Sequence, residues 1–183
     1  TGYLVPGIGA ALEELSGWQP DSDAQWRSHC HALHAGAWQL GARVCDSQIA
    51  AEATELIGAI ASLSGQLQQV LEFVPRTSAS RCPLPRTLLQ SHQLDAAADI
   101  TMLSNPRLPA AIKETITELR EALIRCGPRG AVAFQSLPLF CRILQRINLT
   151  LCTQLLRQPA RVLTERVALA PLRKLWIAWR ERH

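Results

Sequence analysis

Four side chains that can bind metal ions fall within residues 29–34, in the segment HCHALH. On a helix Cys30 and His34 share a face, because they are four residues apart, and they form one candidate pair of zinc ligands. Zinc sites usually need four ligands, and no second pair stands out in the chain. The glutamate of an H-E-x-x-H hydrolase is also missing. We therefore expect Cys30 and His34 to pack at a helix boundary while His29 and His31 face water, with a metal site as the alternative.

Other kinds of catalytic chemistry leave no recognisable motif. There is no G-x-S-x-G nucleophile elbow and no glycine-rich phosphate loop after a strand. The carboxylate pairs Glu13–Glu14 and Asp95–Asp99 fall on predicted helix surfaces, where such pairs are more often solvated than tuned for acid–base catalysis. Catalytic groups assembled from several helices would leave no local motif. We predict a protein without enzymatic activity, cofactor or small-molecule substrate.

The C-terminal segment has the composition of a binding surface. Residues 157–183 hold seven basic residues against two acidic ones, a net charge of +5, and Leu172, Leu175, Trp176 and Trp179 give the last predicted helix an apolar face. Such a helix can lie on an anionic membrane, enter a partner's acidic groove or contact phosphates. The competing and commoner outcome is that both tryptophans pack onto the bundle. The residues that we expect to contact a partner are Arg166, Arg173, Lys174, Trp176, Trp179 and Arg180.

Charge is distributed unevenly along the 183 residues. Residues 1–75 carry eight acidic and two basic side chains, a net charge of −6. Since the whole chain has a net charge of +4, the remaining residues carry +10. This asymmetry indicates either docking between the two halves or an acidic partner for the second half. We do not expect nucleic acid binding, because no reading motif is present and the sequence pI of 8.9 is below that of strongly basic domains.

The six cysteines lack the spacing of a redox pair or a zinc ribbon, since no two are separated by two residues. Most fall on apolar, helix-like segments, where a free cysteine packs as a small apolar residue. This pattern predicts free buried thiols in a reducing, intracellular compartment such as the cytoplasm. We predict no transmembrane helix, because no apolar stretch is long enough, and no signal peptide is visible.

Apolar residues recur with helical spacing through almost the whole chain, which predicts an all-α, multi-helix bundle of seven to eight helices. The clearest element covers residues 46–74, with Asp46 as its cap. Gly58 and Gly65 lie beside its apolar seam and permit close approach of a neighbouring helix. The seam predicts a long central helix, with self-association as the alternative. Its members are spaced alternately by four and three residues: Ile49, Ala53, Leu56, Ile60, Leu63, Leu67, Val70 and Val74.

The bounds of the other predicted helices follow from residues that typically cap or end a helix. A second helix begins at Asp21 or Ser22 and ends at Gly41, and Ser136 caps the helix that reaches Arg157. Residues 140–156 are apolar on most sides, so we expect this helix to be the most enclosed of the second half. The other predicted helices cover residues 8–16, 87–103, 109–126, 160–170 and 171–182.

Residues 75–86, with the sequence PRTSASRCPLPR, read as a linker because they combine prolines with small polar residues. The linker lies where the charge changes sign. We expect residues 1–183 to form a single helical domain, or two helical halves, acidic over residues 1–74 and basic over residues 87–183, joined by this loop.

These observations favour a non-enzymatic protein–protein interaction module: an adaptor, a scaffold subunit or an effector-type binder. Its contact regions would be the basic Arg/Trp C-terminal surface and the loop at residues 75–86, and its partner an acidic protein. The alternative is a membrane-surface or lipid-binding helical domain on an anionic membrane. A metal-dependent enzyme using Cys30 and His34 ranks below both.

Overall fold

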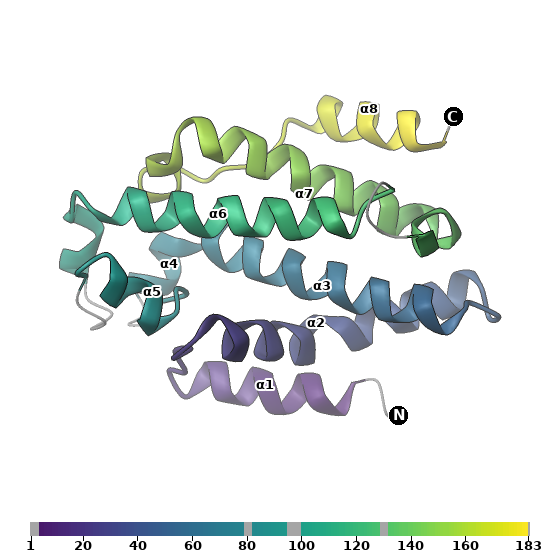
Figure 1. Ribbon diagram of the computed structural model, residues 1–183, viewed down its shortest axis with the longest axis horizontal. Coiled ribbons are helices and arrows are strands. Elements are labelled where there is room, and N and C mark those ends of the chain that lie inside the picture. The colour runs from purple at the N-terminus through teal and green to yellow at the C-terminus, as the bar shows by residue number, and fades with distance from the viewer. Residues whose placement is uncertain (1–3, 79–81, 95–99, 129–131, 183) are drawn as a thin grey trace.

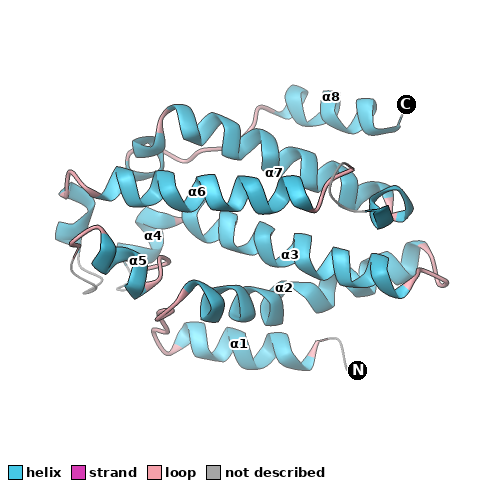
Figure 2. Cartoon of the chain, viewed as in Figure 1, coloured by secondary structure: helices cyan, strands magenta, loops and turns pink. Residues whose placement is uncertain are grey.

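The chain folds entirely into helices in the part that the computed structural model describes, which is residues 4–78, 82–94, 100–128 and 132–182 (Figure 2). Eight α-helices and three short 3-10 helices (η) lie in these residues, which confirms the predicted all-α bundle of seven to eight helices. The elements are α1 (Val5–Leu15), α2 (Asp23–Cys45), α3 (Ala51–Leu71), α4 (Phe73–Ser78), α5 (Arg86–Ser91), η1 (Ile100–Ser104), α6 (Leu108–Arg125), η2 (Val132–Ser136), α7 (Leu139–Arg157), η3 (Pro159–Leu163) and α8 (Pro171–Arg182).

The long helices lie in successive layers (Figure 1). Helix α3 is central, with α2 packed on one side and α6 and α7 on the other. Helix α1 packs mainly on α2, and α8 mainly on α7. As a result α1 and α8 lie at opposite edges of the bundle, and each has one side that no other described helix covers.

Helix α3 is shorter than predicted, because it covers Ala51–Leu71 instead of residues 46–74. Asp46 does not cap it. This residue follows the end of α2, where its carboxylate accepts a hydrogen bond from the backbone N–H of Gln48 at 2.9 Å and shapes the turn between the two helices. The seam behaves as expected in the helix itself, where the buried members are Ala53, Ile60, Leu63, Leu67 and Val70.

Helix α2 begins as predicted and ends later. Ser22 caps it by accepting a hydrogen bond from the N–H of Gln25 at 3.3 Å. The helix continues through Gly41 to Cys45, so the predicted stop at Gly41 is wrong. Ala42, directly after the glycine, is fully buried in a cluster with Ile57 of α3 and with η2. Tertiary packing of this turn therefore outweighs the low helix propensity of glycine.

The two glycines of α3 set the distance to α2, as the sequence predicts. A Cβ atom at Gly58 would lie 2.8 Å from the ring of His31, and one at Gly65 would overlap the ring of His34. Side chains of α2 thus fill the space that the missing Cβ atoms leave. The histidines of the HCHALH segment serve in part as packing groups between the two helices.

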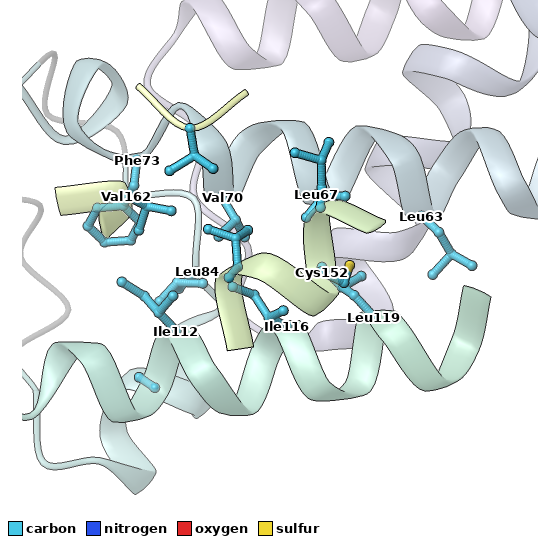
Figure 3. Close-up of a cluster of buried hydrophobic side chains, with 14 of the residues drawn as sticks. Leu63, Leu67, Val70, Phe73, Leu84, Ile112, Ile116, Leu119, Cys152 and Val162 are labelled. Carbon is cyan, nitrogen blue, oxygen red and sulfur yellow. The ribbon is translucent and has the colours of Figure 1, made fainter. Parts of the chain in front are cut away.

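The main core joins both halves of the chain (Figure 3). Residues 75–86 contribute to it and do not form an exposed linker: α4 includes their first four residues, and Cys82 and Leu84 are fully buried. Residues 79–81 lie outside the described part. The backbone N–H of Arg86 donates to the carbonyl of Pro20 at 2.9 Å, which ties this segment to the start of α2. Its apolar residues explain the packing, because a cysteine and a leucine lie between its prolines.

Some helices of the second half match their predicted bounds and others do not. Helices α6 and α8 begin and end within one residue of them. The predicted helix over residues 87–103 is replaced by α5 and η1; residues 95–99, with Asp95 and Asp99, lie outside the described residues. Residues 160–170 hold only η3, followed by non-helical chain.

Helix α7 is also less enclosed than predicted. Ser136 does not cap it, because this hydroxyl donates to the carbonyl of Ala133 at 2.8 Å and Pro138 occupies the cap position. Five residues of α7 are buried, against eight in the shorter α6. The expectation that α7 is the most enclosed helix of the second half is therefore wrong, because a groove runs along one of its sides.

Candidate functional site

The outer side of α8 is an exposed apolar stripe made of Leu172, Leu175, Trp176 and Trp179. These side chains keep between 54% and 80% of their surface accessible. They share one side because they follow the i, i+3, i+4, i+7 spacing of a helix face. The expectation that the two tryptophans pack onto the bundle is therefore wrong. Together with Arg173 and Arg180, we call this set the α8 surface.

Contacts on the opposite side of α8 fix this orientation. Ile177 is buried in the main core, and Val167 and Leu169, just before the helix, are buried with it. The carboxylate of Glu181 accepts a hydrogen bond from Arg146 of α7 at 2.7 Å. Since one apolar anchor and one ion pair hold the inner side, the apolar stripe must point away from the protein.

Basic side chains flank the stripe. Arg173 and Arg180 are exposed, and the guanidinium carbon of Arg180 lies 5.4 Å from the ring centroid of Trp176, a cation–π contact. Glu181 is the only acid of α8 and is paired with Arg146. The α8 surface is thus apolar and positively charged, with no exposed carboxylate of its own helix to oppose an anionic partner.

The structure separates the predicted contact residues into two groups. Trp176, Trp179, Arg173 and Arg180 belong to the α8 surface, whereas Lys174 and Arg166 line a groove on the inner side of α8. This groove is a half-open cavity of about 840 Å³ between α3, α7 and residues 162–169. Its walls include Leu67 and Leu71 of α3, Leu144, Ile147 and Leu151 of α7, and Val162 of η3.

Cys30 and His34 lie on α2 and pack against the rest of the bundle, as expected. Cys30 is fully buried, and burial raises the pKa of its thiol to about 12. Burial lowers the pKa of His34, whose ring lies over Gly65. Within the described residues no three His, Cys, Asp or Glu side chains are grouped so that they could hold a metal ion.

His29 is buried, contrary to expectation, and belongs to a polar cluster that sequence reasoning missed. Its ring stacks on Trp18 with centroids 3.7 Å apart, and its two nitrogens lie 3.3 Å from a carboxylate oxygen of Glu13 and 3.5 Å from one of Glu14. Glu14 also accepts a hydrogen bond from Gln69 of α3 at 2.7 Å. The sequence showed these groups only as separate residues, because the distances along the chain reach 55 positions.

This cluster holds α1 onto the bundle. The imidazole of His29, 3.5 Å away, and the guanidinium of Arg76, 3.4 Å away, lower the pKa of Glu14 against the opposing effect of burial. Gln69 in turn accepts a hydrogen bond from the indole of Trp26 at 2.7 Å. The cavity beside the cluster measures only about 10 Å³, room for a single water molecule at most. With no space for a substrate, the arrangement acts as a structural clamp between α1, α2, α3 and α4.

The six cysteines are all free. Cys30, Cys82, Cys141 and Cys152 are buried, as expected for most of them, whereas Cys45 is exposed and Cys126 lies between these extremes. Burial raises the pKa of each of the four buried thiols. Such thiols are poor nucleophiles at neutral pH, because only the thiolate reacts readily.

Comparison with known proteins adds no family assignment. No protein-family model matches the sequence, and no curated protein is significantly similar to it. In the described part of the chain, no helix combines the length and the apolar character that crossing a bilayer requires. The interpretation of the molecule therefore depends on its own surfaces and cavities.

Proposed function

We propose that the protein is a non-enzymatic interaction module, an adaptor or scaffold subunit, whose α8 surface binds an acidic protein partner. The observation that carries the proposal is the outward orientation of four large apolar side chains on one short helix, flanked by unopposed arginines. Exposed apolar patches with a polar rim mark interaction sites. Tryptophan and arginine are also the residues that contribute most to binding energy at protein interfaces.

The opposite edge of the bundle supports an adaptor in particular. Helix α1 also exposes an apolar stripe, formed by Leu4, Val5, Ile8, Leu12 and Leu15. Residues 4–22, which include this helix, contain no lysine or arginine. The two exposed stripes therefore differ in charge, and their helices lie at opposite edges of the bundle (Figure 1). A protein that joins two different partners needs two such separate surfaces.

A membrane surface is the second candidate occupant. A short helix with tryptophan on its apolar side and arginine beside it is typical of helices that lie in the membrane interface. A flat bilayer on α8 would leave the α1 stripe at the opposite edge exposed, so it would cover only one of the two stripes. We therefore treat membrane binding as an outcome that the experiment must be able to reveal.

The test is affinity capture from a lysate of the source organism, followed by binding measurements with the purified partner. The bait variant Trp176→Ala/Trp179→Ala should lose the partner, with an affinity loss of about 2 kcal/mol or more, roughly thirtyfold. The matched control is Ile8→Ala/Leu12→Ala, which removes two equally exposed apolar side chains from α1 and should retain that partner.

Charge reversal separates the electrostatic contribution from the apolar one. Arg173→Glu/Arg180→Glu should weaken binding of the partner, and raising the salt concentration should weaken the wild type in the same direction. If the tryptophan variant captures the same proteins as the wild type with equal affinity, the proposal is wrong. If it loses only co-sedimentation with phosphatidylserine-rich vesicles, the α8 surface binds membranes instead.

A further inference from the structure

The groove on the inner side of α8 has the size and lining of a small-molecule site. Its volume of about 840 Å³ lies within the range of about 300–1,000 Å³ that is usual for such sites. Apolar side chains from α3, α7 and the segment before α8 form most of its walls. Leu144 and Ile147 of α7 are only partly buried, because this side of the helix borders the groove and not a neighbouring helix.

Most polar groups of the walls already have partners inside the protein. The amide of Asn148 donates to the hydroxyl of Ser64 at 2.6 Å, and this hydroxyl donates to the carbonyl of Ile60 at 2.6 Å. The amide of Gln68 donates to Glu72 at 3.0 Å. An apolar occupant would therefore leave these groups bonded, and would avoid the free-energy cost of burying an unpaired polar group.

The charged groups at the groove leave an excess of positive charge. Of its two carboxylates, that of Glu72 lies 3.4 Å from Arg76, and that of Glu165 is paired with Arg161. Its two cations, Arg166 and Lys174, form no ion pair with any described residue. Two uncompensated cations beside an apolar hollow are complementary to a ligand that has one anionic group and a long apolar chain.

We propose that this groove binds a single-chain amphipathic anion of the long-chain fatty acid class. The hydrocarbon chain lies along Leu144, Ile147 and Leu151 of α7, and the carboxylate is paired with Lys174 and Arg166. No covalent step is involved. The site uses the inner side of α8 and leaves the outward stripe free, so the proposal stands apart from the binding of a protein partner to the α8 surface.

The experiment is a titration with monomeric sodium oleate. Binding is measured by calorimetry and by tryptophan fluorescence, since one tryptophan, Trp38, lines the groove. We expect saturation at one molecule per chain. Ala168→Trp should fill the groove from its exposed wall and reduce affinity at least tenfold. Ala170→Trp is the matched control: this alanine is also exposed, lies two residues away and is outside the groove. It should bind as the wild type does.

The carboxylate contact is tested at the two lysines. Lys174→Glu should weaken oleate binding at least fivefold and leave binding of the uncharged oleyl alcohol unchanged. Lys113→Glu, an exposed lysine on α6 outside the groove, should change neither. If Ala168→Trp proves unfolded by circular dichroism, Gln68→Trp narrows the same groove from an exposed position on α3.

Three results would overturn the proposal. The first is the absence of saturable oleate binding to the wild type. The second is equal affinity in Ala168→Trp or Gln68→Trp and in Ala170→Trp, which would place the oleate elsewhere. The third is oleate uptake that disappears in Trp176→Ala/Trp179→Ala but persists in the groove variants, which would assign the lipid to the α8 surface.

Discussion

Helices α3 and α8 carry apolar side chains at the same helical spacing, but they bury them to opposite extents. On α3 the stripe faces α6 and α7, and Ile60, Leu67 and Val70 are almost inaccessible. On α8 the stripe of Leu172, Leu175, Trp176 and Trp179 faces away from the protein. The difference comes from position in the bundle, since α3 has helices on both sides and α8 has α7 on one side only.

The comparison shows that periodicity identifies an apolar stripe without identifying what covers it. For α3 the cover is the protein itself, so the stripe contributes to folding. For α8 the described residues leave more than half of each stripe side chain accessible, and Ile177 and the Arg146–Glu181 pair anchor the other side of the helix. An apolar side chain that does not stabilise the fold is available to stabilise a complex.

The largest expected effect comes from the same substitution made on each stripe. Leu63→Ala in α3 removes a side chain that is 7% exposed and should reduce the free energy of unfolding by about 3 kcal/mol. Leu175→Ala in α8, where the leucine is 65% exposed, should change it by less than about 0.5 kcal/mol. Urea denaturation of both variants measures the difference. Equal losses would mean that the α8 stripe is part of the folding core.

How far the sequence predicts this molecule depends on the range of the interactions. The helical content, the α3 seam and the bounds of α6 and α8 depend on residues a few positions apart, and they were predicted well. The burial of Cys82 and Leu84 was missed, because it depends on the core formed by distant helices. The same holds for the continuation of α2 beyond Gly41, where contacts with distant residues outweigh a local stop signal.

The candidate sites follow the same rule. The composition of the α8 surface is visible in the sequence, but its outward orientation is set by Ile177 and by Arg146, which lies 35 residues from its partner Glu181. The groove was not predicted at all. It exists because α7, which is apolar on most sides, has no helix against one of them, and no local pattern distinguishes an enclosed side from an open one.

A smaller effect is expected from adding a single methyl group at the centre or at an edge. Gly65→Ala in α3 places a Cβ atom against the ring of His34 and should destabilise the protein by about 1–3 kcal/mol. Gly9→Ala in α1, where a Cβ atom would meet nothing within 4 Å, should stabilise it by about 0.5–1 kcal/mol because alanine favours the helix. Thermal unfolding of the two variants gives the sign directly. A stabilised Gly65→Ala would mean that α2 and α3 are not held in close contact.

The smallest effect expected is a pH dependence of the stability, which comes from titratable groups buried in the central layers of the bundle. Burial lowers the pKa of His34 below its ordinary value of 6.5. The unfolded chain therefore binds a proton at His34 more readily than the folded protein does. The contribution of neutral His34 to the free energy of unfolding is fully present above about pH 6.5. It is lost as the pH falls through the lower pKa of His34 in the folded protein. The lowered pKa of Glu14 acts in the same direction at more acidic pH, below its ordinary value of 4.5.

Urea denaturation between about pH 7 and pH 5 separates the two groups. The wild type should lose stability across this interval, and His34→Gln should flatten the loss, because glutamine does not titrate. His31→Gln, at an exposed position on the same helix, should leave the loss in place. Glu14→Gln should remove the loss of stability below about pH 4.5. Because the charge of Glu14 favours protonated His34, the same variant should also lower the pKa of His34 further. If His34→Gln and His31→Gln had the same profile as the wild type, α2 would not enclose His34 against α3, and the difference between the enclosed centre and the open edge would be smaller than the structure indicates.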